Sequence, residues 1–221
     1  MFRIKICGIT NVDDARAAVD AGADAIGLNF YPKSSRFIDL HDAQQIVDAV
    51  PTDVIKVGVW VNAPSSDIGD VFDRLALDLI QLHGDEPPEF CRELGQRPIL
   101  RAFRCCATDL QPIREYLDQC HRLGAVPRMV LADSFQPGHY GGTGIVADWT
   151  LISADRDRLG AVPLVLAGGL GPHNVAAAIA TARPNAVDTA SGVEESPRRK
   201  SPELIRAFVR AAAEAFSQLH Y

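Results

Sequence analysis

The sequence predicts an α/β protein in which eight parallel strands, each followed by a helix, close into a (β/α)₈ barrel, often called a TIM barrel. Apolar strand-like segments alternate with helical segments along the chain, as in a parallel sheet covered by helices. Most of these strands are apolar on both faces, which is typical of buried parallel strands. The alternation repeats eight times in 221 residues without linker composition between the repeats. We therefore expect one barrel domain over residues 1–221.

The alternative architecture for such a pattern is an open, doubly wound sheet. That fold commonly places a G-x-G-x-x-G motif after its first strand, and no such motif stands there. The absence of this motif and the count of eight favour the barrel.

The first strand and helix can be located from residues 3–22. In RIKIC (3–7), Ile4 and Ile6 share one face of a strand while Lys5 and Cys7 share the other. Asn11 can cap the following helix with support from Asp14, and Gly22 can end that helix. Cys7 should therefore stand at the carboxyl end of the first strand.

The other seven units follow the same rules. Strands are expected at 23–30, 54–61, 77–84 (ending near His83), 99–104, 128–133, 163–169 and 185–192. Helices are expected to begin near Leu40, Pro64, Pro87, Leu110, Trp149, Pro172 and Pro202, the fifth ending at Gly124. The last helix should bury one face formed by Leu204, Ile205, Phe208, Val209, Ala212 and Phe216.

Composition limits the classes of function. A net charge of −6, with 22 basic and 28 acidic residues and no basic stripe beyond Arg198–Lys200, argues against nucleic-acid binding. We expect no membrane partner and a cytoplasmic location, because neither a signal-like segment nor an apolar run of about 20 residues is present. The five cysteines form no C-x-x-C pair, so most are expected to be reduced packing residues.

Polar residues at the expected strand ends are the candidates for chemistry, because barrel enzymes place their active sites there. They are Cys7, Asn29, Asn62, His83, Arg104, Asp133, Gly168, Gly169 and Asp188. Cys7 could equally be a buried packing residue, and Asp133 could bind the amides of its own loop. At a strand end, however, Cys7 could be a thiolate with its pKa lowered by a helix end, and Asp133 a general acid.

Glycine-rich segments occur in the sixth, seventh and eighth loops. They are GGTG (141–144), AGGLGPHN (167–174) and TASGVE (189–194). Such loops hold phosphate in many barrels through backbone N–H groups, so three adjoining loops predict a phosphorylated ligand. Candidate ligand contacts in these loops include Gly142, Gly144, Gly168, Gly169, Ser191 and Gly192.

Arg36 in the second loop could bind a carboxylate at the other end of that ligand. The charges of Lys33, Arg198, Arg199 and Lys200 are expected to be solvated surface.

Together these segments resemble the phosphoribosylanthranilate isomerases of tryptophan biosynthesis. The matching segments run from the first strand to the last helix and include KICGIT (5–10), ADAIGLNFYPKSSRFI (23–38), VGVWVN (57–62), LIQLHGDE (79–86), LADSFQPGHYGGTGIVADW (131–149), LVLAGGLGPHNV (164–175) and AVDTASGVE (186–194).

The resemblance implies an Amadori rearrangement of N-(5-phosphoribosyl)anthranilate, with Cys7 as general base and Asp133 as general acid. On this reading the phosphate is held by backbone amides of Gly142, Gly144, Gly169, Ser191 and Gly192, and further substrate contacts are Arg36, His83, Gly168 and Asp188. Neither a metal ion nor an organic cofactor is expected, and the protein should be a monomer or a homodimer.

The chain departs from the family pattern at three places. Ala147 replaces an aromatic residue, Arg198 stands where glycine is common, and Ser201 stands where aspartate is common.

Three other functions remain open at this stage. A metal-dependent pentose-phosphate epimerase would need histidines at several strand ends, and only His83 is there. A thiol hydrolase would need His83 as a base for Cys7. A non-catalytic barrel that binds a phosphorylated metabolite would keep the glycines without turnover.

Overall fold

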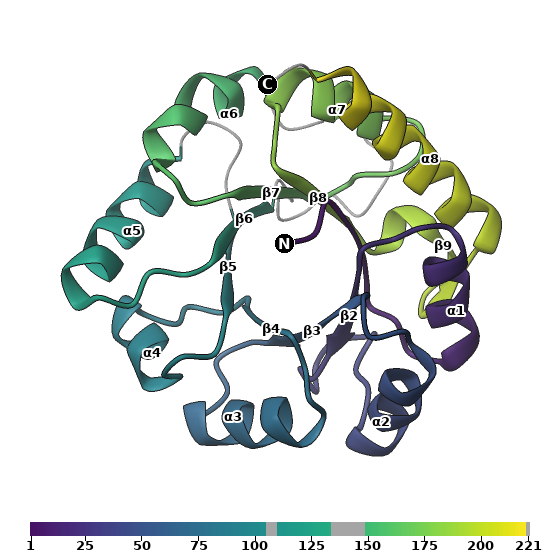
Figure 1. The fold of residues 1–221 in the computed structure, drawn as a ribbon, viewed down its shortest axis with the longest axis horizontal. Coiled ribbons are helices and arrows are strands. Elements are labelled where there is room, and N and C mark those ends of the chain that lie inside the picture. The colour runs from purple at the N-terminus through teal and green to yellow at the C-terminus, as the bar shows by residue number, and fades with distance from the viewer. Residues whose placement is uncertain (105–109, 134–148, 220–221) are drawn as a thin grey trace.

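The computed structural model describes residues 1–104, 110–133 and 149–219, and its eight strands form one closed parallel barrel in chain order. Figure 1 shows them as an inner ring with helices outside it. The strands are β1 (Ile4–Cys7), β2 (Ala25–Asn29), β3 (Ile55–Trp60), β4 (Leu79–Leu82), β5 (Ile99–Arg104), β6 (Met129–Asp133), β7 (Leu164–Ala167) and β8 (Ala186–Thr189). The predicted fold class is confirmed.

A helix follows each strand of the barrel. The helices are α1 (Val12–Asp20), α2 (Leu40–Ala49), α3 (Ser65–Arg74), α4 (Pro88–Glu93), α5 (Gln111–Leu123), α6 (Trp149–Arg156), α7 (Val175–Ala182) and α8 (Pro202–Gln218). Asn11 caps α1 by accepting a hydrogen bond from the Asp14 amide at 2.8 Å, as expected. Gly124 ends α5 in the left-handed conformation, with φ of 65°.

Two short helical turns and a hairpin accompany these elements. The 3₁₀ turns are η1 (Asp157–Leu159) and η2 (Ser191–Val193). The hairpin consists of the antiparallel strands β9 (Glu194–Ser196) and β10 (Arg199–Lys200), between β8 and α8. The sequence did not predict it.

The hydrophobic core has two parts, as barrel geometry requires. One part fills the space between the ring and the helices, where Ile6, Ile26 and Phe208 are fully buried. The other fills the interior of the ring and consists of Phe2, Ala25, Val57, Leu79, Leu100, Ala102, Met129, Leu131, Val165, Ala167 and Ala186. The interior is therefore packed below the mouth of the barrel.

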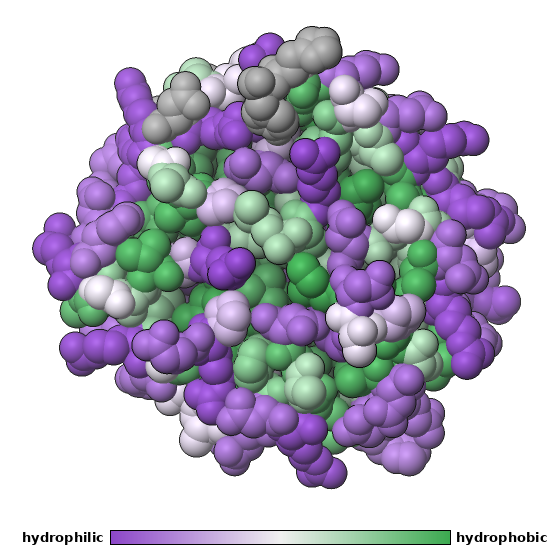
Figure 2. Space-filling model, viewed as in Figure 1, coloured by the Kyte–Doolittle hydropathy of each residue, from purple (hydrophilic) through white to green (hydrophobic). Residues whose placement is uncertain are grey.

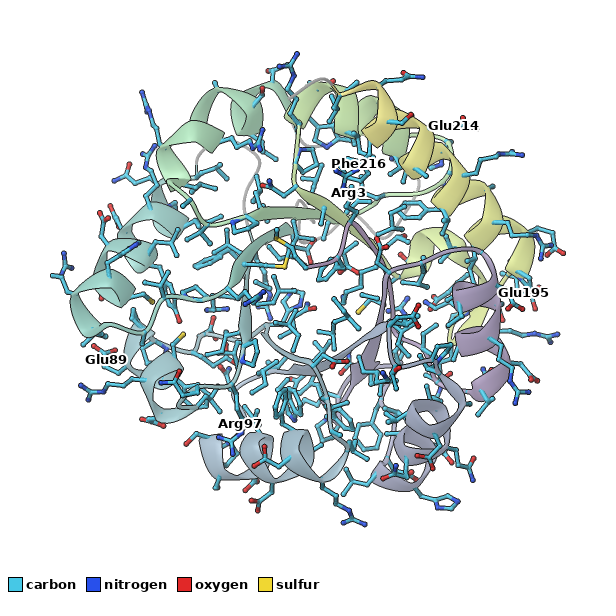
Figure 3. All side chains as sticks on the ribbon, viewed as in Figure 1. Arg3, Glu89, Arg97, Glu195, Glu214 and Phe216 are labelled. Atoms are coloured by element: carbon cyan, nitrogen blue, oxygen red, sulfur yellow. The ribbon has the colours of Figure 1, made fainter. Side chains whose placement is uncertain are left out.

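Helix α8 lies against the strand that closes the ring. Figure 3 shows Arg3 and Phe216 together, and the Arg3 guanidinium lies 5.6 Å from the centre of the Phe216 ring. The predicted apolar face of α8 is buried except for Leu204, which is 36% exposed. Leu204 lies in the first turn of the helix, one residue before the buried Ile205.

The outer surface is mainly polar. In Figure 2, hydrophilic side chains surround the rim of the molecule and apolar ones gather toward the middle of this face. Among the described residues, no helix has both the length and the apolar character that a bilayer crossing requires.

Candidate active site at the carboxyl ends of the strands

The described residues predicted for the site lie around a single pocket of about 300 Å³. It is lined by Cys7, Arg36, His83, Asp133, Gly168, Gly169, Asp188, Ser191 and Gly192, with Asn29, Gln81 and Thr189 among the others. Asn62 and Arg104, also at strand ends, are not among its lining residues. Gly142, Gly144 and Ala147 lie outside the described residues.

Cys7 faces the interior of the barrel at the end of β1. Its register partner on β2 is Gly27, and a Cβ at Gly27 would lie 2.7 Å from the Cys7 sulfur and 3.2 Å from Lys5 Cε. The absent side chain of Gly27 thus provides the space in which the thiol and the lysine stem lie. Cys7 is 9% exposed and borders the pocket.

The electrostatic surroundings of Cys7 differ from the predicted ones. Burial raises the pKa of the thiol above its usual range, while Lys5 opposes this shift, Asp188 adds to it and Lys200 opposes it. The expectation of a pKa lowered by a helix end is therefore wrong. Helix α1 begins only at Val12, and the cations near the thiol are buried lysines.

Asp133 ends β6 and faces His83 from the end of β4. The His83 Nε2 and Asp133 Oδ2 atoms are 3.4 Å apart, and both side chains are partly exposed to the pocket. On its other side, the His83 ring contacts Gln81 Nε2 through Nδ1 at 3.1 Å. Gln81 is 1% exposed and its Oε1 atom has no hydrogen-bond partner among the described residues.

Arg36 is held by the hairpin at the opposite end of the chain. Its Nε and Nη2 atoms each donate to a carboxylate oxygen of Glu194 at 2.7 Å. The backbone of Arg36 is held from β2, because Asn29 Nδ2 donates to Ser34 Oγ and this oxygen accepts from the Arg36 amide. The second loop is thus ordered by bonds at both ends.

Lys200 corrects the prediction that the charges of residues 198–200 are all solvated. Its side chain is fully buried, and its Nζ donates to Glu194 Oε1 at 3.0 Å and to the Ala190 carbonyl at 2.9 Å. Burial lowers the pKa of Lys200 despite the neighbouring Glu194 carboxylate. The sequence of three consecutive basic residues does not indicate that the last one, Lys200, is buried.

The glycines of the seventh and eighth loops approach each other closely. Gly168 and Gly169 have φ of 87° and 65°, which favours glycine at both positions. A Cβ at Gly192 would lie 1.9 Å from the Leu170 carbonyl oxygen, so only glycine fits there. Thr189 Oγ1 donates to the same carbonyl at 2.6 Å and fixes the contact between the two loops.

The sequence did not identify Lys5, Gln81, Glu194 or Lys200 as part of this region. For Lys5 and Gln81 a pattern was available, because each stands two residues before a candidate on the same strand and therefore on the same face. Within the described ranges, no group of three or more His, Cys, Asp or Glu side chains is placed to hold a metal ion.

Comparison with protein families decides the relationship. The family model described as N-(5'-phosphoribosyl)anthranilate (PRA) isomerase matches residues 4–211, nearly the whole chain. The chain belongs to this family. The fold, the isomerase class and the tryptophan pathway expected from the resemblance are confirmed.

Isomerases of this family from several bacteria are similar along their full length. The N-(5'-phosphoribosyl)anthranilate isomerase of Geobacter sulfurreducens is 43% identical over 213 residues, which cover 96% of this chain and 98% of that protein. That of Pseudomonas aeruginosa strain UCBPP-PA14 is 47% identical over 211 residues, covering 95% and 94%.

Solved structures of this family show the same barrel. The phosphoribosyl anthranilate isomerase of Thermotoga maritima has a TM-score of 0.86 at 41% identity, covering 97% of this chain and 100% of that chain. A family structure in complex with reduced 1-(o-carboxyphenylamino)-1-deoxyribulose 5-phosphate has a TM-score of 0.81 at 40% identity, with the same coverage. A further structure describes monomers generated from the dimeric Thermotoga maritima enzyme.

Proposed function

We propose that this chain isomerises N-(5-phosphoribosyl)anthranilate to 1-(2-carboxyphenylamino)-1-deoxyribulose 5-phosphate, with Cys7 as general base and Asp133 as general acid. One observation carries the assignment of roles. Cys7 from β1 and Asp133 from β6 border the same pocket, and these strands are separated by two others on the shorter way around the ring. An acid and a base can therefore reach different sides of one sugar.

The reaction needs two proton transfers. Asp133 donates a proton to the ring oxygen of the ribose, the ring C–O bond breaks, and the nitrogen lone pair forms a protonated Schiff base. Cys7 then removes the proton from C2, and the electrons of that bond neutralise the iminium nitrogen to give an enolamine. Return of a proton to C1 and loss of the enol proton yield the ketone.

The two anionic ends of the substrate are assigned to opposite parts of the pocket. Backbone N–H groups around Gly168, Gly169, Ser191 and Gly192 would hold the phosphate, because these residues offer an approach without bulky side chains. Gly142 and Gly144 stay predicted contacts. Arg36 would hold the anthranilate carboxylate, and Nη1 is the guanidinium nitrogen that Glu194 does not engage.

His83 and Asp188, both predicted to bind substrate, also contact other charged residues of the site. His83 contacts Asp133 and so can fix the carboxyl group toward the substrate. Asp188 borders the pocket, but its Oδ1 atom is already bound to Lys5 at 2.8 Å. We also propose a cytoplasmic location, since phosphorylated sugars do not cross membranes unaided.

The test follows the fluorescence decay of phosphoribosylanthranilate made in situ from anthranilate and phosphoribosyl pyrophosphate. We expect rapid decay with the wild type and a loss of about 10²- to 10⁴-fold in both Cys7→Ala and Asp133→Asn. Cys91→Ala, which removes a buried thiol of α4 outside the pocket, is the matched control and should keep full turnover.

Decay no faster than the spontaneous background with a folded wild type would overturn the proposed function. Binding of inorganic phosphate without turnover would then support a non-catalytic barrel.

A further inference from the structure

A charged pair lies inside the barrel directly below Cys7. Lys5 is fully buried, and its Nζ atom donates to Asp188 Oδ1 at 2.8 Å. The pair follows from the register of the sheet, in which Lys5 is the partner of Asp188 across the β1–β8 contact that closes the ring. Burying an ion pair costs free energy, because both charges lose their hydration. A pair placed beside a reactive residue therefore suggests a role in the reaction.

Lys5 and Cys7 point to the same side of β1 because they are two residues apart in a strand. The space above Gly27 holds both the Lys5 Cε and the Cys7 sulfur, which places the ammonium group beside the thiol. The charge of Lys5 acts on the Cys7 thiol, and Lys5 is also bound to Asp188 by a hydrogen bond and by charge. The lysine is thus shared between a carboxylate and the thiol.

We propose that Lys5 is a positioning residue for the reaction, whose buried ammonium group, anchored by Asp188, stabilises the thiolate of Cys7. The inference rests on the proposed function, in which Cys7 is the base. Without a cation, a thiolate in this buried place would lack compensation for its lost hydration.

Other charged groups also act on Cys7. Lys200 of β10 favours the thiolate, Asp188 of β8 opposes it, and Arg36 of the second loop interacts with the Cys7 charge. Glu194 neutralises part of the charge of Lys200 and Arg36. His83 and Asp133 border the pocket from β4 and β6.

The effect of Lys5 on the Cys7 thiolate can be distinguished from a structural effect, because Lys5 and Asp188 act on the thiolate in opposite directions. Removing Lys5 should disfavour the thiolate, whereas removing the negative charge of Asp188 should favour it. A purely structural role would predict loss in both variants.

The experiment measures the rate of Cys7 alkylation by iodoacetamide against pH, with the modified peptide quantified by mass spectrometry. This rate reports the thiolate fraction. At pH 7.5 we expect Lys5→Met to be roughly 10- to 1,000-fold slower than the wild type, because loss of one neighbouring charge moves a pKa by about 1–3 units. Asp188→Asn should be faster than the wild type. At high pH the thiol is fully ionised, so differences between the variants there report access to the thiol. Each rate at pH 7.5 is therefore divided by the high-pH rate of the same variant.

Two further variants keep the test decisive. Lys56→Met removes a buried lysine of β3 that does not line the pocket and should leave the alkylation profile unchanged. If Lys5→Met alone does not fold, the double variant Lys5→Met/Asp188→Asn removes both charges. It should still alkylate more slowly than Asp188→Asn.

An alkylation profile of Lys5→Met equal to that of the wild type, or of the double variant equal to that of Asp188→Asn, would overturn the inference. Turnover of Cys7→Ala equal to that of the wild type would instead overturn the role of Cys7 as base, so the two failures are distinguishable.

Discussion

At the scale of single residues, the position of Arg198 carries a conformational cost. Its φ is 72°, in the left-handed region that L side chains rarely adopt, and it lies in the turn between β9 and β10. Glycine, the residue expected here from the resemblance, adopts this φ without steric penalty. The Arg198 carbonyl accepts a hydrogen bond from Thr10 Oγ1 at 3.1 Å, which helps to hold the turn in place.

We expect Arg198→Gly to increase the free energy of unfolding by about 1 kcal/mol, because glycine adopts this φ without the steric penalty. Urea unfolding of the two proteins measures the difference. Arg199→Gly, the same change at an exposed neighbour without positive φ, should not stabilise the protein. A destabilised Arg198→Gly variant would show that side-chain contacts outweigh the backbone strain.

Gly27 tests how tightly the thiol is placed. A Cβ there would lie 2.7 Å from the Cys7 sulfur and 3.1 Å from the Cys7 Cα atom, so the strand or the thiol must move. We expect Gly27→Ala to lower turnover by about 10²-fold, since a displacement of about 1 Å has effects of that order. Circular dichroism of the variant checks that the barrel is folded, so that a loss of turnover reports the displaced thiol. Full turnover would mean that the site tolerates a shifted base.

At the scale of elements, the sequence was most informative where burial repeats regularly. All eight strands lie where they were predicted, because each is an apolar run and barrel strands are buried on both faces. The hairpin β9–β10 was missed because ESPRRK has no apolar alternation. It is held by ionic contacts of Glu194 and Lys200, whose partners are distant in the sequence or on the hairpin itself.

The candidate site likewise has residues that the sequence predicts and residues that only the structure shows. Cys7, Asp133 and the glycines could be found from their places at strand ends and in loops. Lys5 could have been found from its place on the same strand face as Cys7. Lys200 could not, because charged residues are usually solvated and only the folded chain shows that this one faces inward.

Helix α8 depends on the residue that precedes it. Ser201 caps it, with its Oγ accepting from the Leu204 amide at 3.3 Å, and an aspartate at this position could cap the helix in the same way. We expect Ser201→Ala to lower the free energy of unfolding by about 1 kcal/mol and Ser201→Asp to retain it. Ser217→Ala, at the far end of the same helix, should change stability much less. Equal losses at the two ends would argue against a capping role.

At the scale of the whole molecule, the hairpin joins the end of the chain to its beginning. Arg36 and Glu194 are separated by 158 residues, and the Lys200 amide donates to Asp14 Oδ2 at 3.1 Å across 186 residues. Together with the β1–β8 pairing, these contacts secure the closure of the ring at the level of the loops. Because the closure is partly ionic, it should depend on pH.

Glu194 makes this dependence measurable. Burial alone would raise the pKa of its carboxyl group, but hydrogen bonds and charge from Arg36 and Lys200 hold the pKa below its usual range. At a given pH, the Glu194 carboxyl group is therefore protonated more readily in the unfolded chain than in the folded protein. The stabilisation is complete above the ordinary carboxyl pKa and is lost as the pH falls through the lower folded pKa.

We expect the free energy of unfolding to fall between pH 7 and pH 3, and to fall less in Glu194→Gln, which has no carboxyl group to titrate at this site. Urea unfolding at a series of pH values measures both slopes. Glu214→Gln is the control, because this exposed glutamate lies far along α8, away from the hairpin, and contacts neither Arg36 nor Lys200. Parallel pH curves for the wild type and Glu194→Gln would show that the Arg36–Glu194–Lys200 contacts do not stabilise the closed ring.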